Sequence, residues 1–116
     1  MPAIEAGDAL RISARAAGRL AGAVREAGVL ALSMFQTPIR NWTKGPSSSP
    51  VCEADIAVDK LLRERLMTAG DSIAWLSEES ADDARRLGAR YVWIVDPIDG
   101  TRAYIAGLSD WAVSAA

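Results

Sequence analysis

Residues 91–101 read YVWIVDPIDGT, and this stretch decides the class of fold. The run Tyr91–Val95 is apolar, β-branched and aromatic throughout, which predicts a buried β-strand. Pro97 has no backbone N–H to donate, so we expect the strand to stop there. The side chains of Asp96 and Asp99 should therefore emerge at a strand end, where ligands commonly bind in open α/β sheets.

A second acidic strand end precedes this one. The run Ser72–Leu76 predicts a short strand, and Glu78 and Glu79 follow it directly. If the two strands are neighbours, these carboxylates gather at one edge and suit a hard cation such as Mg²⁺. Two such ions about 4 Å apart would clamp a phosphoryl group for in-line transfer. If Gly100 and Thr101 open a short helix, their N–H groups would face the phosphate.

Each half of this pattern also has a plainer interpretation. An Asp-x-x-Asp spacing by itself is more often a capped turn, and a Glu-Glu pair is more often solvated. Only the combination of a buried strand, a proline and a second acidic strand end favours a metal site.

The other elements are predicted from periodicity and from turn residues. We expect a first helix that ends before Pro38, a second helix, a short charged helix or turn, and a last strand, at about residues 5–35, 53–69, 81–88 and 111–116. Asn41–Pro50 is rich in Gly, Pro and Ser, which predicts a loop, either a linker or a flap over a site.

Apolar spacing indicates which helix faces are buried. On the first helix the expected face is Leu10, Ala14, Ala17, Ala21, Val24, Gly28, Ala31 and Phe35. On the second it is Ile56, Leu61, Leu62 and Leu66, with Gly70 just past the end. Arg11, Arg15 and Arg19 recur every four residues and indicate a solvated face rather than an anion site.

Composition excludes several classes of protein. With 116 residues, 50% hydrophobic and 24% charged, the chain is typical of one soluble domain or part of one. A net charge of −2 argues against a nucleic-acid polymer as partner. We see no transmembrane run and no signal peptide, and a single cysteine, Cys52, predicts a cytoplasmic protein. The absence of histidine excludes Ser-His-Asp and Cys-His catalysis and His-ligated zinc.

The strand-end motif closely resembles a family signature. Trp93–Thr101, WIVDPIDGT, is similar to the signature of the inositol monophosphatase superfamily, which are Mg²⁺-dependent, lithium-sensitive phosphatases. Lys44, the SPV block at 49–51, the EAD block at 53–55 and the SEE block at 77–79 match further family blocks in the right order. The resemblance covers nearly the whole chain.

The resemblance implies a fold and a domain organisation. The fold class would be α+β, the N-terminal half of a layered α/β sugar-phosphatase-like fold with long helices on a mixed, largely antiparallel sheet. Because the family's domain is more than twice this length, residues 1–116 are expected to be the N-terminal portion of one metal-dependent phosphatase domain, apparently truncated. The family's second signature, W-D-x-A-[AG]-G, is absent, so we expect little or no activity from the chain alone.

The resemblance also implies roles for individual residues. Two or three Mg²⁺ ions would be held by Glu78, Asp96, the carbonyl of Ile98, and Asp99. Thr101 paired with Asp55 would activate the attacking water. The substrate would be bound by the amides of Gly100 and Thr101 and by Lys44.

The substrate class is less sharply defined by the motifs. Ser77 before the glutamate pair and Arg102 after Thr101 resemble bacterial 3'(2'),5'-bisphosphate nucleotidases, which act on 3'-phosphoadenosine 5'-phosphate. An inositol-1-monophosphatase or a related sugar-phosphate phosphatase is the alternative. Cys52 departs from the family's usual threonine. A homodimer of the full-length form, acting on a small phosphate ester, is what the resemblance implies.

Two other classes of protein share part of this pattern. Haloacid-dehalogenase-type phosphatases need an Asp-x-Asp spacing, whereas Asp96 and Asp99 are three residues apart. A truncated, non-catalytic metal-binding or interaction module would keep part of the fold without turning over phosphate esters.

Overall fold

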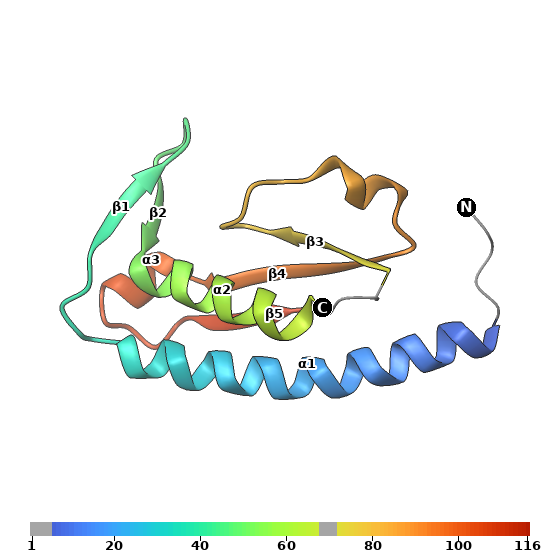
Figure 1. Cartoon of the computed structure of the whole chain (residues 1–116). Coiled ribbons are helices and arrows are strands. Elements are labelled where there is room, and N and C mark those ends of the chain that lie inside the picture. The colour runs from blue at the N-terminus through green and yellow to red at the C-terminus, as the bar shows by residue number, and fades with distance from the viewer. Residues whose placement is uncertain (1–5, 68–71) are drawn as a thin grey trace.

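The strand at the centre of the sequence motif is also the middle strand of a mixed sheet. The computed structural model describes residues 6–67 and 72–116. In it β4 (Tyr91–Asp99) lies between β3 (Ile73–Ser77), to which it is parallel, and β5 (Ala112–Ala115), to which it is antiparallel. Helices α1 (Ala6–Met34) and α2 (Glu53–Leu66) pack together on this sheet, which gives the expected α+β fold (Figure 1).

The buried faces of the helices differ partly from those predicted. On α1 the buried residues are Ala23, Ala27 and Ala31, whereas the predicted Ala14, Ala17 and Ala21 are exposed. Alanine and glycine occur on several sides of this helix, so its apolar period alone does not define one face. The side chain of Leu10 lies outside the described residues.

Helix α2 also corrects one predicted core position. Leu62 and Leu66 are fully buried, and Leu61 packs against the core, but Ile56 is 44% exposed. The buried stripe of this helix runs instead through Val58. Gly70, predicted just past the helix, lies outside the described residues.

The segment predicted as a loop is a β-hairpin. β1 (Asn41–Lys44) pairs antiparallel with β2 (Ser49–Cys52), and Gly45 and Ser48 adopt the left-handed backbone conformation in the turn. Pro50 is tolerated because a short ribbon leaves one side of each strand free of ladder hydrogen bonds. The hairpin projects from one end of the molecule, and Cys52 leads directly into α2 (Figure 1).

Pro97 does not stop the central strand. β4 continues to Asp99, and its pairing with β5 shifts register between Asp96 and Asp99. A proline is tolerated at such an irregularity because the ladder hydrogen bonds are already interrupted there. The expected burial of this strand is also only partial, since Trp93 and Val95 face the helices while Ile94 is 57% exposed.

Short elements complete the chain. A 3-10 helix, η1 (Ala84–Gly88), stands where a charged helix or turn was predicted, and α3 (Thr101–Ile105) follows β4. The rings of Phe35, Tyr104 and Trp111 pack together with centroid separations of 4.9–5.3 Å. The hydroxyl of Tyr104 donates to the carbonyl of Ala31 at 2.7 Å, which fastens α3 to α1.

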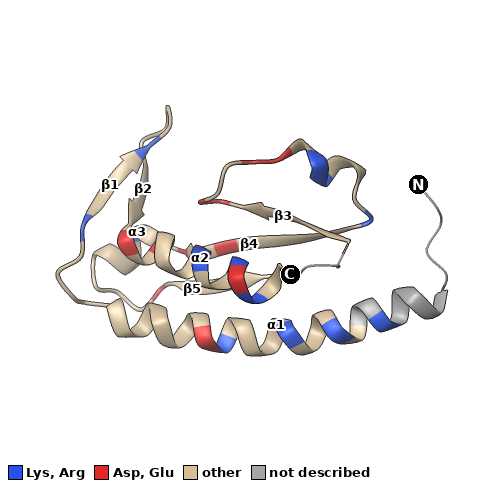
Figure 2. Ribbon diagram, viewed as in Figure 1, with Lys and Arg blue, Asp and Glu red and all other residues tan. Residues whose placement is uncertain are grey.

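The charged residues are unevenly distributed. In Figure 2 basic residues line the N-terminal half of α1, and acidic residues lie around the ends of β3 and β4. Arg11 and Arg15 are exposed, in agreement with the predicted solvated face, while Arg19 is half-buried. Among the described residues no helix is both long and apolar enough to cross a bilayer.

Leu62→Ala should destabilise the chain by about 3 kcal/mol, because it removes a fully buried side chain and leaves a cavity between the helices and the sheet. Ile56→Ala on the same helix is the matched control and should cost less than about 1 kcal/mol. Urea unfolding followed by circular dichroism measures both. Equal losses would show that the core does not pass through Leu62.

Candidate active site

The parallel pairing of β3 and β4 brings the two acidic strand ends together. Ser77 is opposite Val95 in the register, so Glu78 and Asp96 are the next residues on adjacent strands. The backbone N–H of Glu78 donates to the carbonyl of Val95 at 3.2 Å, which holds the turn after β3 against β4. The predicted neighbourhood of these two acidic residues is therefore present.

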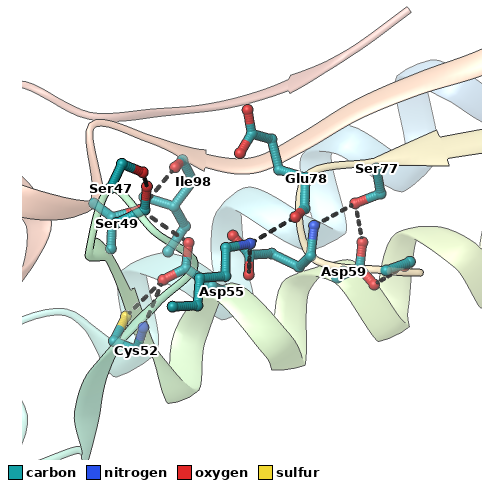
Figure 3. Close-up of polar contacts among 12 residues, drawn as sticks. Ser47, Ser49, Cys52, Asp55, Asp59, Ser77, Glu78 and Ile98 are labelled. Carbon is teal, nitrogen blue, oxygen red and sulfur yellow. Dashed lines mark hydrogen bonds and ion pairs between the residues drawn. The ribbon is translucent and has the colours of Figure 1, made fainter. Parts of the chain in front are cut away.

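Asp55 joins α2 to the segment after β4. It is fully buried, and its Oδ2 accepts from the backbone N–H of Cys52 at 2.9 Å and from Cys52 Sγ at 3.1 Å (Figure 3). Its Oδ1 accepts from Thr101 Oγ1 at 2.9 Å. Thr101 Oγ1 also lies 3.1 Å from the carbonyl oxygen of Ile98. The predicted Thr101–Asp55 pair is in hydrogen-bonded contact.

Gly100 is required where β4 turns into α3. Its φ is 91°, and a Cβ there would lie 2.5 Å from the carbonyl oxygen of Asp110. Only glycine avoids both the left-handed strain and this contact with backbone. The tight turn presents Thr101 at the first position of α3.

A cavity of about 290 Å³ opens where these segments meet. It is lined by Lys44, Ser49, Pro50, Glu78, Glu79, Asp96, Ile98, Gly100, Thr101 and Arg102. Six of the eight site residues predicted from the sequence are therefore in its wall. The other two are Asp55, which is buried and contacts the wall through Thr101, and Asp99, which is exposed and does not line the cavity.

The β-hairpin contributes a cation to this cavity. Lys44 Nζ donates to the carbonyl oxygen of Glu78 at 2.6 Å and to Glu79 Oε2 at 3.0 Å. The Glu79 side chain is only 6% exposed, so this ion pair is better shielded than a surface pair. The hairpin is thus attached to the acidic turn that follows β3.

The electrostatics of the cavity favour an added cation. Burial, with repulsion from Glu78 and Asp99, raises the pKa of Asp96 to about 6. Burial also raises the pKa of Glu79, although the hydrogen bond and charge of Lys44 oppose the shift. Carboxylates that hold one another's pKa up in this way would be stabilised by a bound cation.

The donor set fits a hard cation in its chemistry. Carboxylates and the Ile98 carbonyl are the oxygen ligands that Mg²⁺ prefers. The side chains are not closed around one point: within residues 6–67 and 72–116, no three His, Cys, Asp or Glu side chains converge as a metal-binding group. The positive charge in the cavity wall comes instead from Lys44 and Arg102.

Sequence reasoning missed one polar cluster beside the site. Asp59, one turn after Asp55 on α2, accepts hydrogen bonds from the hydroxyls of Ser77 and Ser80. The signal was present, because two serines flank the Glu78–Glu79 pair and Asp55 and Asp59 share a helix face. The negative charge of Asp59 is stabilised there by two hydroxyl donors.

A larger cavity, of about 890 Å³, lies between the end of α2, β3 and η1. Arg63, which stacks over Trp75 at 5.6 Å, is part of its wall. Among the described residues its acidic side chains, Asp82 and Asp83, are paired with Arg86 and Arg85, so this part of the wall presents no free carboxylate pair for catalysis. The chemistry therefore points to the smaller cavity.

Comparisons with known proteins agree with this fold and motif. The sequence model of the inositol monophosphatase family matches residues 16–116. The chain is 50% identical over 60 residues to a 3'-phosphoadenosine 5'-phosphate phosphatase of Mycobacterium leprae, covering 51% of this chain and 22% of that protein. It is 38% identical over 73 residues to an inositol-1-monophosphatase of Rhizobium meliloti, covering 63% and 27%.

A solved structure has a similar fold. The extragenic suppressor protein SuhB of Bartonella henselae superposes with a TM-score of 0.74 and 28% identity, covering 85% of this chain and 38% of that chain. The helices packed on a mixed sheet define an α+β fold that is shared with this solved structure. The chain belongs to the inositol monophosphatase family. It spans between a fifth and two fifths of the length of these relatives.

Asp96→Asn should stabilise the chain at pH 7 in the absence of metal. The folded pKa of Asp96 lies near 6, above its ordinary value of 3.8, so the folded chain favours the protonated form. The contribution of protonated Asp96 to the stability of the folded chain is fully present below about pH 4, and it is lost as the pH rises through about 6. The gain at pH 7 should be about 1 kcal/mol after the discount for solvent screening.

Thermal unfolding between pH 4 and pH 7 measures this difference. The exposed Asp110→Asn is the control for loss of one negative charge and should change stability at pH 7 by less than about 0.5 kcal/mol. An Asp96→Asn variant with the wild-type slope would contradict the electrostatic description of the cavity.

Proposed function

We propose that this chain is the N-terminal part of a Mg²⁺-dependent phosphomonoesterase that hydrolyses a small phosphate ester. The single observation that carries the proposal is the 2.9 Å hydrogen bond from Thr101, which lines the cavity with Glu78 and Asp96, to the buried Asp55 behind it. A hydroxyl backed by a buried carboxylate is suited to accept a proton from water. Acidic side chains beside it are suited to hold the cation that such a reaction needs.

The reacting water would be deprotonated toward Thr101. As the Thr101 hydroxyl accepts a proton from water, it passes its own proton to Asp55 Oδ1, with which it is already hydrogen-bonded. The other oxygen of Asp55 stays bonded to the Cys52 N–H and Sγ, so the carboxylate keeps its orientation during the transfer. The resulting hydroxide attacks phosphorus, and the ester oxygen leaves on the opposite side.

Two or three Mg²⁺ ions would be held by Glu78, Asp96, the Ile98 carbonyl and Asp99. When bound, the metal polarises the phosphoryl oxygens and lowers the pKa of water. The amides of Gly100 and Thr101, with Lys44, would contact the phosphate from the protein side. Lys44 is already paired with Glu79, so its positive charge would reduce the repulsion between the Glu79 carboxylate and an incoming anionic substrate.

We propose 3'-phosphoadenosine 5'-phosphate as the preferred substrate. The Mycobacterium leprae relative carries that activity in its name, and Arg102 lines the cavity, where a second phosphate would need a cation. An inositol-1-monophosphatase is the second candidate, because the Rhizobium meliloti relative has that name and matches a larger share of this chain. A cytoplasmic homodimer is the assembly we expect of the whole protein.

A non-catalytic metal-binding module is the alternative from another class. It is favoured by the lack of a closed ligand group among the described residues. Such a module would bind Mg²⁺ without releasing phosphate from any ester.

Phosphate release distinguishes these functions. Residues 16–116 would replace the matching segment of the Mycobacterium leprae relative, and the chimera would be assayed with Mg²⁺ on 3'-phosphoadenosine 5'-phosphate and on inositol 1-phosphate. Preference for the nucleotide supports the first candidate, and preference for the inositol ester supports the second. A folded chimera that binds Mg²⁺ and releases no phosphate would leave the non-catalytic module.

Thr101→Val in that chimera should lower kcat by roughly 100-fold, because it removes the hydroxyl that receives the water proton while keeping the side-chain volume. KM and Mg²⁺ affinity should change little. Thr43→Val, in the exposed hairpin, is the matched control and should keep full activity. Unchanged kcat in Thr101→Val would exclude this residue from the proton transfer.

A further inference from the structure

Asp59 is hydrogen-bonded to both ends of the turn that carries the Glu78–Glu79 pair. It is 9% exposed and lies one helical turn after Asp55 on the same face of α2 (Figure 3). Ser77 Oγ donates to its Oδ1, and Ser80 Oγ donates to its Oδ2 at 2.5 Å. These serines stand immediately before and immediately after the glutamate pair, so one carboxylate holds both ends of the acidic turn.

The direction of every hydrogen bond in this cluster is determined. The backbone N–H of Glu79 donates to Ser77 Oγ at 3.3 Å, and the indole N–H of Trp75 donates to Ser80 Oγ at 3.2 Å. Both of these groups can only donate, so each serine hydroxyl accepts from one of them while it donates its own hydrogen to Asp59. The cluster therefore needs an acceptor on both oxygens of residue 59, which a carboxylate provides and an amide does not.

Two carboxylates of α2 thereby hold the two sides of the cavity. Asp55 is bonded to Thr101 after β4, and Asp59 is bonded to the turn after β3. A helix is stiff over one turn, so the separation of these two carboxylates sets where Glu78 stands relative to Thr101. Asp59 itself does not line the cavity.

We infer that Asp59 is a positioning residue that, through Ser77 and Ser80, fixes the acidic turn in the geometry needed for metal binding. This inference rests on the proposed metal-dependent function. Partners one shell removed from metal ligands typically change metal affinity by 10- to 100-fold when they are lost.

The first test needs no metal. Amide hydrogen exchange followed by NMR on the 116-residue chain reports the Glu79 N–H, and the indole N–H resonance reports Trp75. Asp59→Ala and Asp59→Asn should both speed exchange at Glu79 at least 10-fold and shift the Trp75 indole resonance. Val58→Ala, at a fully buried neighbour on the same helix, is the control for general loss of stability. It should speed exchange at Glu79 no more than at other protected amides, and it should not shift the Trp75 indole resonance.

The second test titrates the same variants with Mg²⁺ by calorimetry. The expected result is affinity about 10-fold weaker for Asp59→Ala and unchanged for Val58→Ala. Ser80→Ala removes the hydrogen bond between Ser80 and Asp59, and it replaces Asp59→Ala in both tests if that variant does not fold. Wild-type affinity and wild-type exchange at Glu79 in the Asp59 variants would overturn the inference.

The two tests separate this inference from the proposed function. If the wild-type chain binds no Mg²⁺ but the Asp59 variants selectively speed amide exchange at Glu79, the proposed metal site is wrong. The hydrogen bonds of Asp59 to the turn then have a structural role only. If the wild-type chain binds Mg²⁺ and the Asp59 variants bind it equally, the metal site stands and the positioning role is wrong.

Discussion

The carboxylate of Asp55 has no contact with solvent, so the protein itself must satisfy both of its oxygens. The Cys52 N–H and thiol satisfy one, and the Thr101 hydroxyl satisfies the other. These contacts join the start of α2, the end of the hairpin and the turn after β4 at one point. Removing any donor would leave a buried charge partly unsatisfied, so the three segments are held together by electrostatic necessity as well as by packing.

The sheet sets the second condition. Because β3 and β4 are parallel and paired, their ends open at the same edge, and the acidic turns need no further element to bring them side by side. The aromatic packing of Phe35, Tyr104 and Trp111 then holds α3 in place behind Thr101. Residues that do not face the cavity thus help to hold its wall in place.

Much of this could be predicted from local chemistry. The apolar run at Tyr91–Val95 has one good structural interpretation, and an acidic turn after each of two strands predicts where ligands meet. The wrong or missing features depend on pairing and contacts that the local pattern of residue types does not show. Pro97 is accommodated by a register shift against β5, and the hairpin is closed by pairing between strands too short to show alternation. Asp59 is a functional candidate only once Ser77 and Ser80, about twenty residues away, are known to meet it.

The burial of Cys52 gives the protein an internal reporter. Its side chain is inaccessible, and burial, together with the hydrogen bond to Asp55, raises the pKa of the thiol to about 11. The thiolate is the form that reacts with alkylating reagents, so the folded state withholds both access and reactivity. Labelling requires an opening that also releases Asp55. Because this is the single cysteine of the chain, the rate at which it is alkylated measures how often the contact between Cys52 and Asp55 opens, without any engineered probe.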